Sequence, residues 1–293
     1  MPDLIQKINV PVSVLGEGPV WSERDQCLYF VDIVSRLVQR YRPHDGEYKS
    51  WRFEGYTGSL AECRSGGLIL ALTDRVVRFD PAKGERSAEE IAVLEQDRPR
   101  NRLNDGKTDP WGRFWVGSMQ VDEKASTGRL WCVTGDGKAT QQRDNIGVSN
   151  SLAFDEGRNR MYFADSMTGM IEWAHVDAGA APPSLAWKPF AKAGKGSPDG
   201  SCTDADGYLW NAEWAGSRIV RYSPSGEIDR VIEMPVSRPS CCTFGGPDYR
   251  TLFVTSAQYN MTEREKQQDP NAGSLYCVQL NDVLGVPASQ FAA

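Results

Sequence analysis

The chain has 293 residues, a formal net charge of −6 and an isoelectric point near 5.2. This acidic balance provides no basic surface for nucleic acid, and no apolar run approaches the roughly 20 residues that span a bilayer. The N-terminus carries neither the basic segment nor the apolar stretch of a secretory signal. We therefore expect a cytoplasmic protein whose partners include no nucleic acid and no membrane.

Six short apolar runs recur along the chain and predict the second strands of six repeating units. Their first residues are separated by roughly 40 to 48 positions, which is the spacing of four-stranded propeller blades. Turn signals rich in Gly, Pro, Asp and Asn precede the runs, and further strand-like segments follow them. The runs begin at Leu28, Leu68, Phe114, Met161, Leu209 and Leu252.

The regular repeat favours an all-β fold, a six-bladed β-propeller with four-stranded antiparallel blades. A β-sandwich or a closed barrel is the alternative, but neither requires a fixed period of this length. No Ser- or Pro-rich linker divides the chain, so we expect a single domain over residues 1–293. A first strand near Lys7 to Val14 is predicted to complete the last blade beside Ser274 to Gln279, which would hide two strand edges.

Four polar residues open apolar strands that end in turns, and we interpret them as occupying the same place in four of the repeats. If the repeats surround an axis, these residues form a ring of carboxylates and amides. Such oxygen ligands suit Ca²⁺, Mg²⁺ or Mn²⁺ and do not exclude Zn²⁺ or Fe²⁺. Taken singly, each residue is equally well a turn former or a solvated side chain, and only the matching phase favours a ring. The four are Glu17, Asn104, Asn150 and Asp199.

The remaining polar and reactive residues narrow the chemistry. Asp109, Asp155 and Asp204 stand at the far ends of the same strands and are predicted to cap turns. The seven cysteines include no C-x-x-C pair, so buried reduced thiols are favoured over a disulfide framework. The two histidines, His44 and His175, are expected near the surface, which leaves a Ser-His-Asp triad or a multi-histidine zinc site poorly supported.

Several motifs resemble the senescence marker protein/gluconolactonase/regucalcin family. They occur in order over nearly the whole chain, and the longest of them is highly specific. The resemblance implies a six-bladed propeller with a divalent metal in its axial tunnel and an activity that hydrolyses sugar lactones to aldonic acids. The motifs are Gly16-Glu-Gly-Pro-Val-Trp, Arg102-Leu-Asn-Asp-Gly-Lys-Thr-Asp-Pro-Trp-Gly-Arg-Phe-Trp-Val-Gly, Ser149-Asn-Ser-Leu-Ala-Phe, Pro198-Asp-Gly and Phe244-Gly-Gly-Pro-Asp.

Carried over residue by residue, the resemblance implies that Glu17, Asn150 and Asp199 ligate the metal. It also implies that Arg102 and Asn104 bind hydroxyl or carbonyl oxygens of the substrate. With the cation as Lewis acid, Asp199 is the expected general base for an attacking water.

Two places depart from the family pattern or vary within it. The family usually has glycine where this chain has Ser151, which puts the backbone geometry at that position in question. The segment Met119 to Thr127 corresponds to a variable loop over the pocket. Glu123 in that loop is either a contact to a sugar hydroxyl or a solvated charge.

Two other functions remain open. One is a calcium-binding or scaffold propeller without turnover, and the other is a hydrolase of non-sugar lactones or phosphotriesters with an apolar pocket. Trp115, Trp210, Trp214 and Tyr259 are the aromatic residues that would line such a pocket. For the lactonase we expect a small sugar lactone as substrate and a monomer or weak oligomer.

Overall fold

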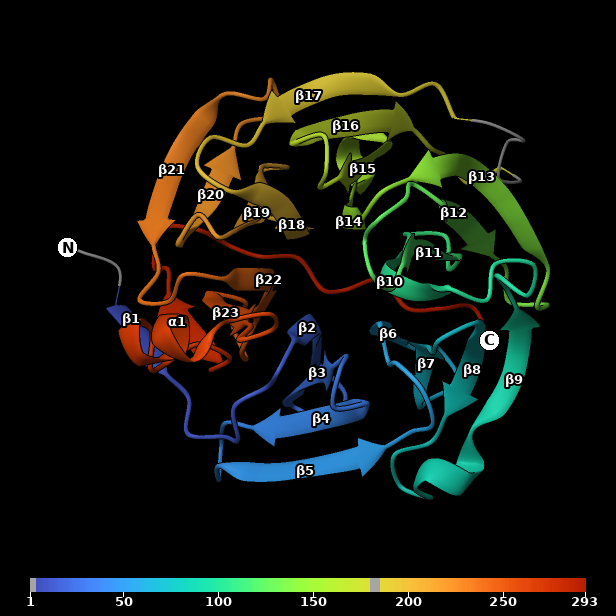
Figure 1. Ribbon diagram of the computed structural model, residues 1–293, viewed down its shortest axis with the longest axis horizontal. Coiled ribbons are helices and arrows are strands. Elements are labelled where there is room, and N and C mark those ends of the chain that lie inside the picture. Colours follow the sequence, from blue (N-terminus) through green and yellow to red (C-terminus); the bar gives the residue numbers. More distant parts are fainter. Residues whose placement is uncertain (1–3, 180–184) are drawn as a thin grey trace.

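The computed structural model describes residues 4–179 and 185–293. Six four-stranded sheets stand around a central axis as the blades of a propeller (Figure 1). Every strand pairs antiparallel with its neighbour within its blade (for example in the first blade). The prediction of an all-β, six-bladed propeller is confirmed.

Each blade runs from an inner strand at the axis to an outer strand at the rim. The first contains β2 (Gly16–Ser22), β3 (Cys27–Asp32), β4 (Leu37–Arg42) and β5 (Glu47–Arg52). The second contains β6 (Ser59–Glu62), β7 (Leu68–Ala71), β8 (Arg75–Phe79) and β9 (Glu89–Val93). The third contains β10 (Asn101–Thr108), β11 (Phe114–Gln120), β12 (Gly128–Val133) and β13 (Ala139–Ile146). The fourth contains β14 (Ser149–Asp155), β15 (Arg160–Asp165), β16 (Met170–His175) and β17 (Lys188–Lys192). The fifth contains β18 (Ser197–Thr203), β19 (Leu209–Trp214), β20 (Arg218–Tyr222) and β21 (Ile228–Glu233).

The sixth blade joins the two ends of the chain. It contains β22 (Pro239–Gly245), β23 (Thr251–Ser256), β24 (Tyr276–Gln279) and, as its outer strand, β1 (Leu4–Lys7). The predicted closure by an N-terminal strand is therefore confirmed, but the predicted bounds of Lys7 to Val14 are wrong. Leu4 pairs with Gln279 and Lys7 with Tyr276, whereas residues 8–14 cross to the first blade. Pro11 lies in that crossing, where it has no N–H to donate to a ladder.

The core lies between the blades, because the second strand of every blade is buried on both faces. The apolar runs that revealed the repeat are these strands, and β3, β7 and β11 are buried at every residue. Burial on both faces explains why they read as continuous apolar runs while the outer strands are half polar. In the described residues, helical structure is limited to α1 (Glu263–Gln268) and to 3₁₀ turns at Glu85–Ser87 and Glu156–Arg158.

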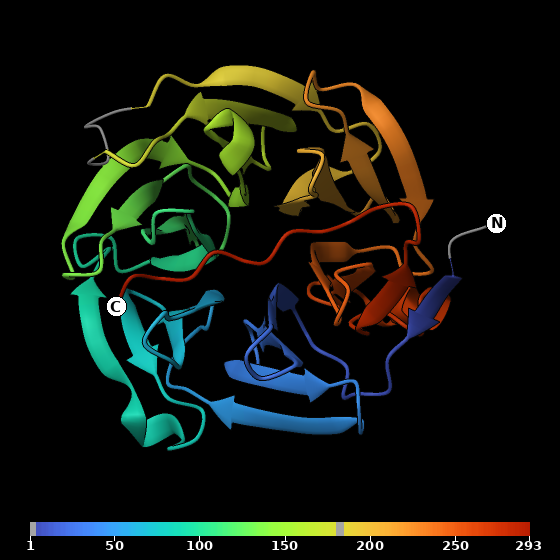
Figure 2. The ribbon, with the colours of Figure 1, turned by 180° about the vertical axis from the view of Figure 1, so that it is seen from behind.

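The C-terminal segment crosses one mouth of the central tunnel, as the view from behind shows (Figure 2). It is anchored at both ends by backbone hydrogen bonds. Ala205 donates to Leu284, while Phe291 donates to Glu62 and accepts from Arg64. This segment makes the two mouths of the tunnel different. The described part of the chain contains no helix with the length and apolar character of a membrane span.

Candidate functional site

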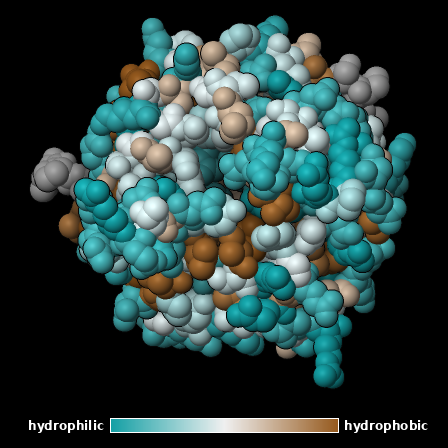
Figure 3. Space-filling model, viewed as in Figure 1, coloured by the Kyte–Doolittle hydropathy of each residue, from teal (hydrophilic) through white to brown (hydrophobic). Residues whose placement is uncertain are grey.

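A cavity of about 320 Å³ opens at the tunnel mouth where the inner strands begin. On the face turned away from the C-terminal segment, the space-filling view is hollowed near its centre (Figure 3). Residues from five of the six blades contribute to the cavity wall. All six residues predicted from the sequence lie on it: Glu17, Arg102, Asn104, Glu123, Asn150 and Asp199.

The four ring residues occupy equivalent positions, as predicted. Each directly follows the residue that pairs with the end of an apolar second-strand run, in the pairs Gly16–Asp32, Leu103–Ser118, Ser149–Asp165 and Pro198–Glu213. Each inner strand that carries one has a bulge next to it. Glu17 and Asn150 are the last residues of the regular ladder before the bulge, paired with Val31 and Ala164. Asn104 and Asp199 have no ladder partner of their own, although they follow Leu103 and Pro198 in the same way. All four residues therefore lie where a bulge begins and interrupts the alternation of side chains, so that all four can line the same tunnel.

Two positions beside the candidate ligands have unusual backbone, and a third lies in close contact with a neighbouring strand. Gly18 has φ of 52° and Ser151 has φ of 61°, in the left-handed region. Ser151 thus has a conformation that glycine adopts without strain. At Gly200 a Cβ atom would lie 2.2 Å from the sulfur of Cys241, so β18 and β22 approach as closely as glycine allows.

A chain of hydrogen bonds orients the amides of the site. The guanidinium of Arg102 donates to Oδ1 of Asn104 at 2.5 Å, and Nδ2 of Asn104 donates to Oδ1 of Asn150 at 3.0 Å. Nδ2 of Asn150 then donates to the Ser166 hydroxyl at 2.9 Å, which donates to the carbonyl of Pro198 at 2.6 Å. These hydrogen bonds link three blades and fix the orientation of the Asn150 amide group.

The carboxylates of Glu17 and Asp199 lie close together. Glu17 and Asp199 are buried, and their side chains are within hydrogen-bonding reach of each other. Burial and the negative charge of Asp105 raise the pKa of Glu17 to about 8. Burial, Glu17 and Asp105 raise the pKa of Asp199 well above its usual range. Neighbouring buried acids of this kind mark a place where a positive charge would be stabilised.

This donor set fits a hard divalent cation. It offers two carboxylates and one oriented amide oxygen, and hard cations prefer oxygen ligands. Thiolate and imidazole ligands play no part, and the described residues contain no cluster of three or more His, Cys, Asp or Glu side chains suited to a metal. Three protein ligands would leave coordination positions for water and substrate.

Comparisons with known proteins give the family of this chain. Residues 15–258 match the family described as "SMP-30/Gluconolactonase/LRE-like region". The chain belongs to this family. It is 34% identical over 272 residues to a 6-deoxy-6-sulfogluconolactonase of Pseudomonas putida, covering 92% of each chain. It is 32% identical to regucalcin of Xenopus laevis over 286 residues, with 95% of each covered. A crystal structure of regucalcin from Agrobacterium tumefaciens, described as a calcium-binding protein, superposes with a TM-score of 0.93 at 26% identity, covering 100% of this chain and 98% of the other.

The four aromatic residues that were expected to line an apolar pocket divide into two groups. Trp214 and Tyr259 line the cavity. Trp115 and Trp210 do not, because both are fully buried between blades, where their indole N–H groups donate to Asp109 and Asp204 at 2.8 Å. The expectation that all four lie near the pocket is therefore wrong for these two.

The three aspartates at the far ends of these inner strands cap turns, as predicted. Asp109 accepts from the backbone N–H groups of Trp111 and Arg113. Asp155 accepts from Arg158, and Asp204 from Asp206 and Tyr208. The predictions of free cysteines and of surface histidines are also confirmed.

Several residues that shape the site were missed from the sequence. Asp105 lies beside Asn104, and its carboxylate accepts from the backbone N–H of Leu152 at 2.8 Å. Asn211 is fully buried in β19 and bonds the carbonyl of Asp199 at 2.8 Å. Asn211 could have been noticed because it is a polar residue inside an otherwise apolar second strand.

Proposed function

We propose that this protein hydrolyses a sugar lactone to the aldonic acid with the help of one divalent cation. The observation that carries the proposal is the convergence of Glu17, Asn150 and Asp199 from three blades on one cavity. The names of relatives support the reaction class, since one is a sulfogluconolactonase. Regucalcin described as calcium-binding supports a divalent ion without identifying it.

In this proposal Glu17, Asn150 and Asp199 hold the cation, which when bound supplies Lewis-acid polarisation of an ester carbonyl. Asp199 accepts a proton from the attacking water and returns it to the ring oxygen that leaves. The raised pKa of Asp199, which results from burial and from Glu17, gives it more affinity for a proton than an exposed aspartate has.

Arg102 and Asn104 bind the substrate in this proposal. The Arg102 guanidinium lies 5.6 Å from the ring centroid of Tyr56 and also donates to the carbonyl of Leu103. These contacts hold it at the cavity wall, from which it can donate to hydroxyl or carbonyl oxygens. Glu123 is exposed at the rim, where its carboxylate can accept from a sugar hydroxyl.

The test is acid production from a panel of sugar lactones, corrected for spontaneous hydrolysis, with and without a chelator. We expect the chelator to abolish turnover and added Ca²⁺, Mn²⁺ or Zn²⁺ to restore it. Asp199→Asn should lower kcat by at least about 100-fold at saturating metal. The matched control Asp206→Asn, at an exposed turn, should leave turnover unchanged.

The same assay separates the alternatives. Chelator-sensitive binding of a cation without acid production from any lactone would indicate a binding or scaffold propeller. Turnover of aliphatic lactones or phosphotriesters in preference to sugar lactones would indicate the other hydrolase class. Full activity of Asp199→Asn would refute the assignment of the base.

A further inference from the structure

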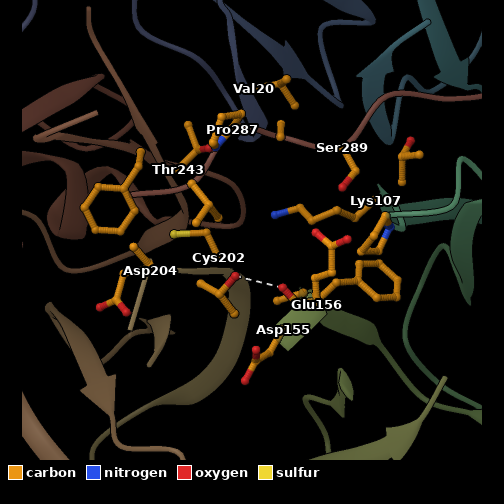
Figure 4. A pocket seen from close by; sticks show the side chains of 18 of the residues that line it. Val20, Lys107, Asp155, Glu156, Cys202, Asp204, Thr243, Pro287 and Ser289 are labelled. Carbon is orange, nitrogen blue, oxygen red and sulfur yellow. Dashed lines mark hydrogen bonds between the residues drawn. The ribbon is translucent and has the colours of Figure 1, made fainter. Parts of the chain in front are cut away.

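A second cavity, of about 520 Å³, lies at the opposite end of the tunnel, where the inner strands end. The C-terminal segment forms one of its walls through Val286, Pro287, Ala288 and Ser289 (Figures 2 and 4). We propose that this cavity binds a small organic anion, a monocarboxylate with a compact apolar body, through the ammonium group of Lys107. The proposal does not depend on the lactonase activity proposed above.

The first support is the position of Lys107, whose ammonium group has no carboxylate within ion-pair distance among the described residues. Its side chain reaches into the cavity that Cys202, Thr243 and Glu156 also line (Figure 4). The ammonium donates to the carbonyl of Ser201 at 2.5 Å. Within the described residues no carboxylate lies within 4.0 Å of it. Since an ammonium group has three donors, a ligand can be accepted without breaking the contact to Ser201.

The second support is that two acids on the cavity wall are already paired. The Asp155 carboxylate lies 2.9 Å from the guanidinium of Arg158. Asp204 lies 2.7 Å from Arg221 and also accepts from Trp210. Both acids are therefore paired with arginine. The acid whose charge does act on Lys107 is the buried Asp105, and burial raises the pKa of that carboxyl. Glu156 is the exposed exception at the rim.

The ammonium stays charged in this place. Burial by itself lowers the pKa of Lys107, and the negative charge of Asp105 acts in the opposite direction. A charged donor forms a shorter and stronger hydrogen bond to a carboxylate than a neutral donor does.

The third support is the apolar character of the remaining wall. Phe154 and Phe244 face the cavity from separate blades, and Val20 and Leu60 from two others. The volume lies within the range of roughly 300 to 1,000 Å³ typical of small-molecule sites. One cation and apolar walls together select a ligand with one anionic end and an apolar body.

The C-terminal segment gives the site a wall that can adjust to its ligand. Its anchors are Leu284 and Gly285 on one side and Phe291 on the other, and among the described backbone groups none from residues 286–290 forms a backbone–backbone hydrogen bond. A ligand can displace residues 286–290 without breaking backbone hydrogen bonds between strands.

The experiment is calorimetric titration of the chelator-treated protein with benzoate and, as a neutral match of the same shape, benzamide. We expect benzoate to bind with a Kd below about 1 mM and benzamide at least about 10-fold more weakly. Lys107→Met should weaken benzoate binding at least about 10-fold, and Lys107→Arg should retain it within about 3-fold. Glu156→Gln, which removes a nearby negative charge, should strengthen it.

Location is tested separately, with 4-iodobenzoate soaked into crystals and located by its anomalous signal. The iodine should lie in the cavity beside the C-terminal segment, and Arg102→Met at the other mouth should not alter benzoate affinity. Equal affinity for benzoate and benzamide, or an iodine at the Glu17–Asp199 end, would overturn the proposal. If Lys107→Met does not fold, the comparison of benzoate with benzamide and the position of the iodine in the crystal still test the proposal.

Discussion

The hydroxyl of Ser151 donates a hydrogen bond of 2.6 Å to the main-chain carbonyl of Asp199. This bond joins β14 to β18, the two inner strands that carry Asn150 and Asp199. The amide of the buried Asn211 lies 2.9 Å from the same hydroxyl and 2.8 Å from the same carbonyl. Ser151 therefore cross-links the strands that carry these two candidate ligands.

Removing this hydroxyl should loosen the site. Ser151→Ala loses the cross-link and keeps a side chain at φ of 61°, so we expect a loss of about 1–2 kcal/mol of unfolding free energy. Ser151→Gly loses the same bonds but relieves the left-handed strain, which offsets about 1 kcal/mol. Urea unfolding should therefore rank wild type above glycine and glycine above alanine.

Both variants should also bind Ca²⁺ more weakly by calorimetry, because the backbone of Asp199 is less firmly held. Ser50→Ala, an exposed serine in β5, is the matched control and should change neither quantity. Unaltered metal affinity in both Ser151 variants would show that the cross-link does not position Asp199.

The sequence predicts the blades well because every second strand is buried on both faces and so repeats as an apolar run. It predicts the site less exactly. Asn104-Asp105-Gly106 and Asp199-Gly200 look like turns, since Asx-Gly pairs favour turns, yet both lie in bulged strands. The bulges that begin at Glu17 and at Asp199 cannot be recognised from the spacing of the repeats.

The contacts between blades could not be predicted from one sequence. Ser151 bonds a carbonyl 48 positions away, and Asn211 bonds a hydroxyl 60 positions away. Such contacts depend on how neighbouring blades pack, which neither periodicity nor turn composition reports. The second cavity could not be predicted either, because one of its walls is formed by the C-terminal segment, which returns across the tunnel.

The metal-free protein should become less stable as the pH rises. Burial and Asp105 raise the pKa of Glu17 from 4.5 to about 8 in the folded state. A group with a raised folded pKa favours folding while it is protonated, so its contribution is lost between about pH 4.5 and about pH 8. We expect the Tm of chelator-treated protein to fall across this window, whereas saturating Ca²⁺ should remove the decline.

Glu17→Gln provides the control, because it stays neutral at every pH. Its metal-free Tm should change less over the same window, and Ca²⁺ should stabilise it less than the wild type. A metal-free wild-type Tm that rises with pH would contradict the assigned direction of the shift.

Arg102 should matter most for substrates with many hydroxyls. Its guanidinium is buried and donates to Asn104 and Leu103, with further donors directed to the cavity. Arg102→Met should lower kcat/KM for a polyhydroxylated lactone by about 10- to 100-fold, the effect of losing charged hydrogen bonds. An unsubstituted aliphatic lactone should lose much less. Equal losses on both substrates would mean that Arg102 supports the site without contacting sugar. The control Arg100→Met changes an exposed arginine and should leave kcat/KM for both substrates unchanged.

Glu213 should stabilise the entry of the chain into β18. Its buried carboxylate accepts two bonds from Arg218, at 2.8 and 2.9 Å, and one from each backbone N–H of Gly194, Lys195 and Gly196. Burial alone would raise the pKa of Glu213, but Arg218 and the three N–H groups outweigh burial and bring it to about 2. Glu213→Gln leaves Arg218 buried without its charge partner, so we expect a loss of about 3 kcal/mol near neutral pH.

The pH dependence distinguishes this ion pair from a packing effect. A lowered folded pKa contributes stability that is present above about pH 4.5 and is lost as the pH falls toward about 2. The difference in urea unfolding free energy between wild type and Glu213→Gln should therefore shrink at acid pH. Glu233→Gln, which removes only an exposed partner of Lys195, should cost less than about 1 kcal/mol. A difference for Glu213→Gln that stays constant down to about pH 3 would assign its effect to shape and hydrogen bonding, and not to charge.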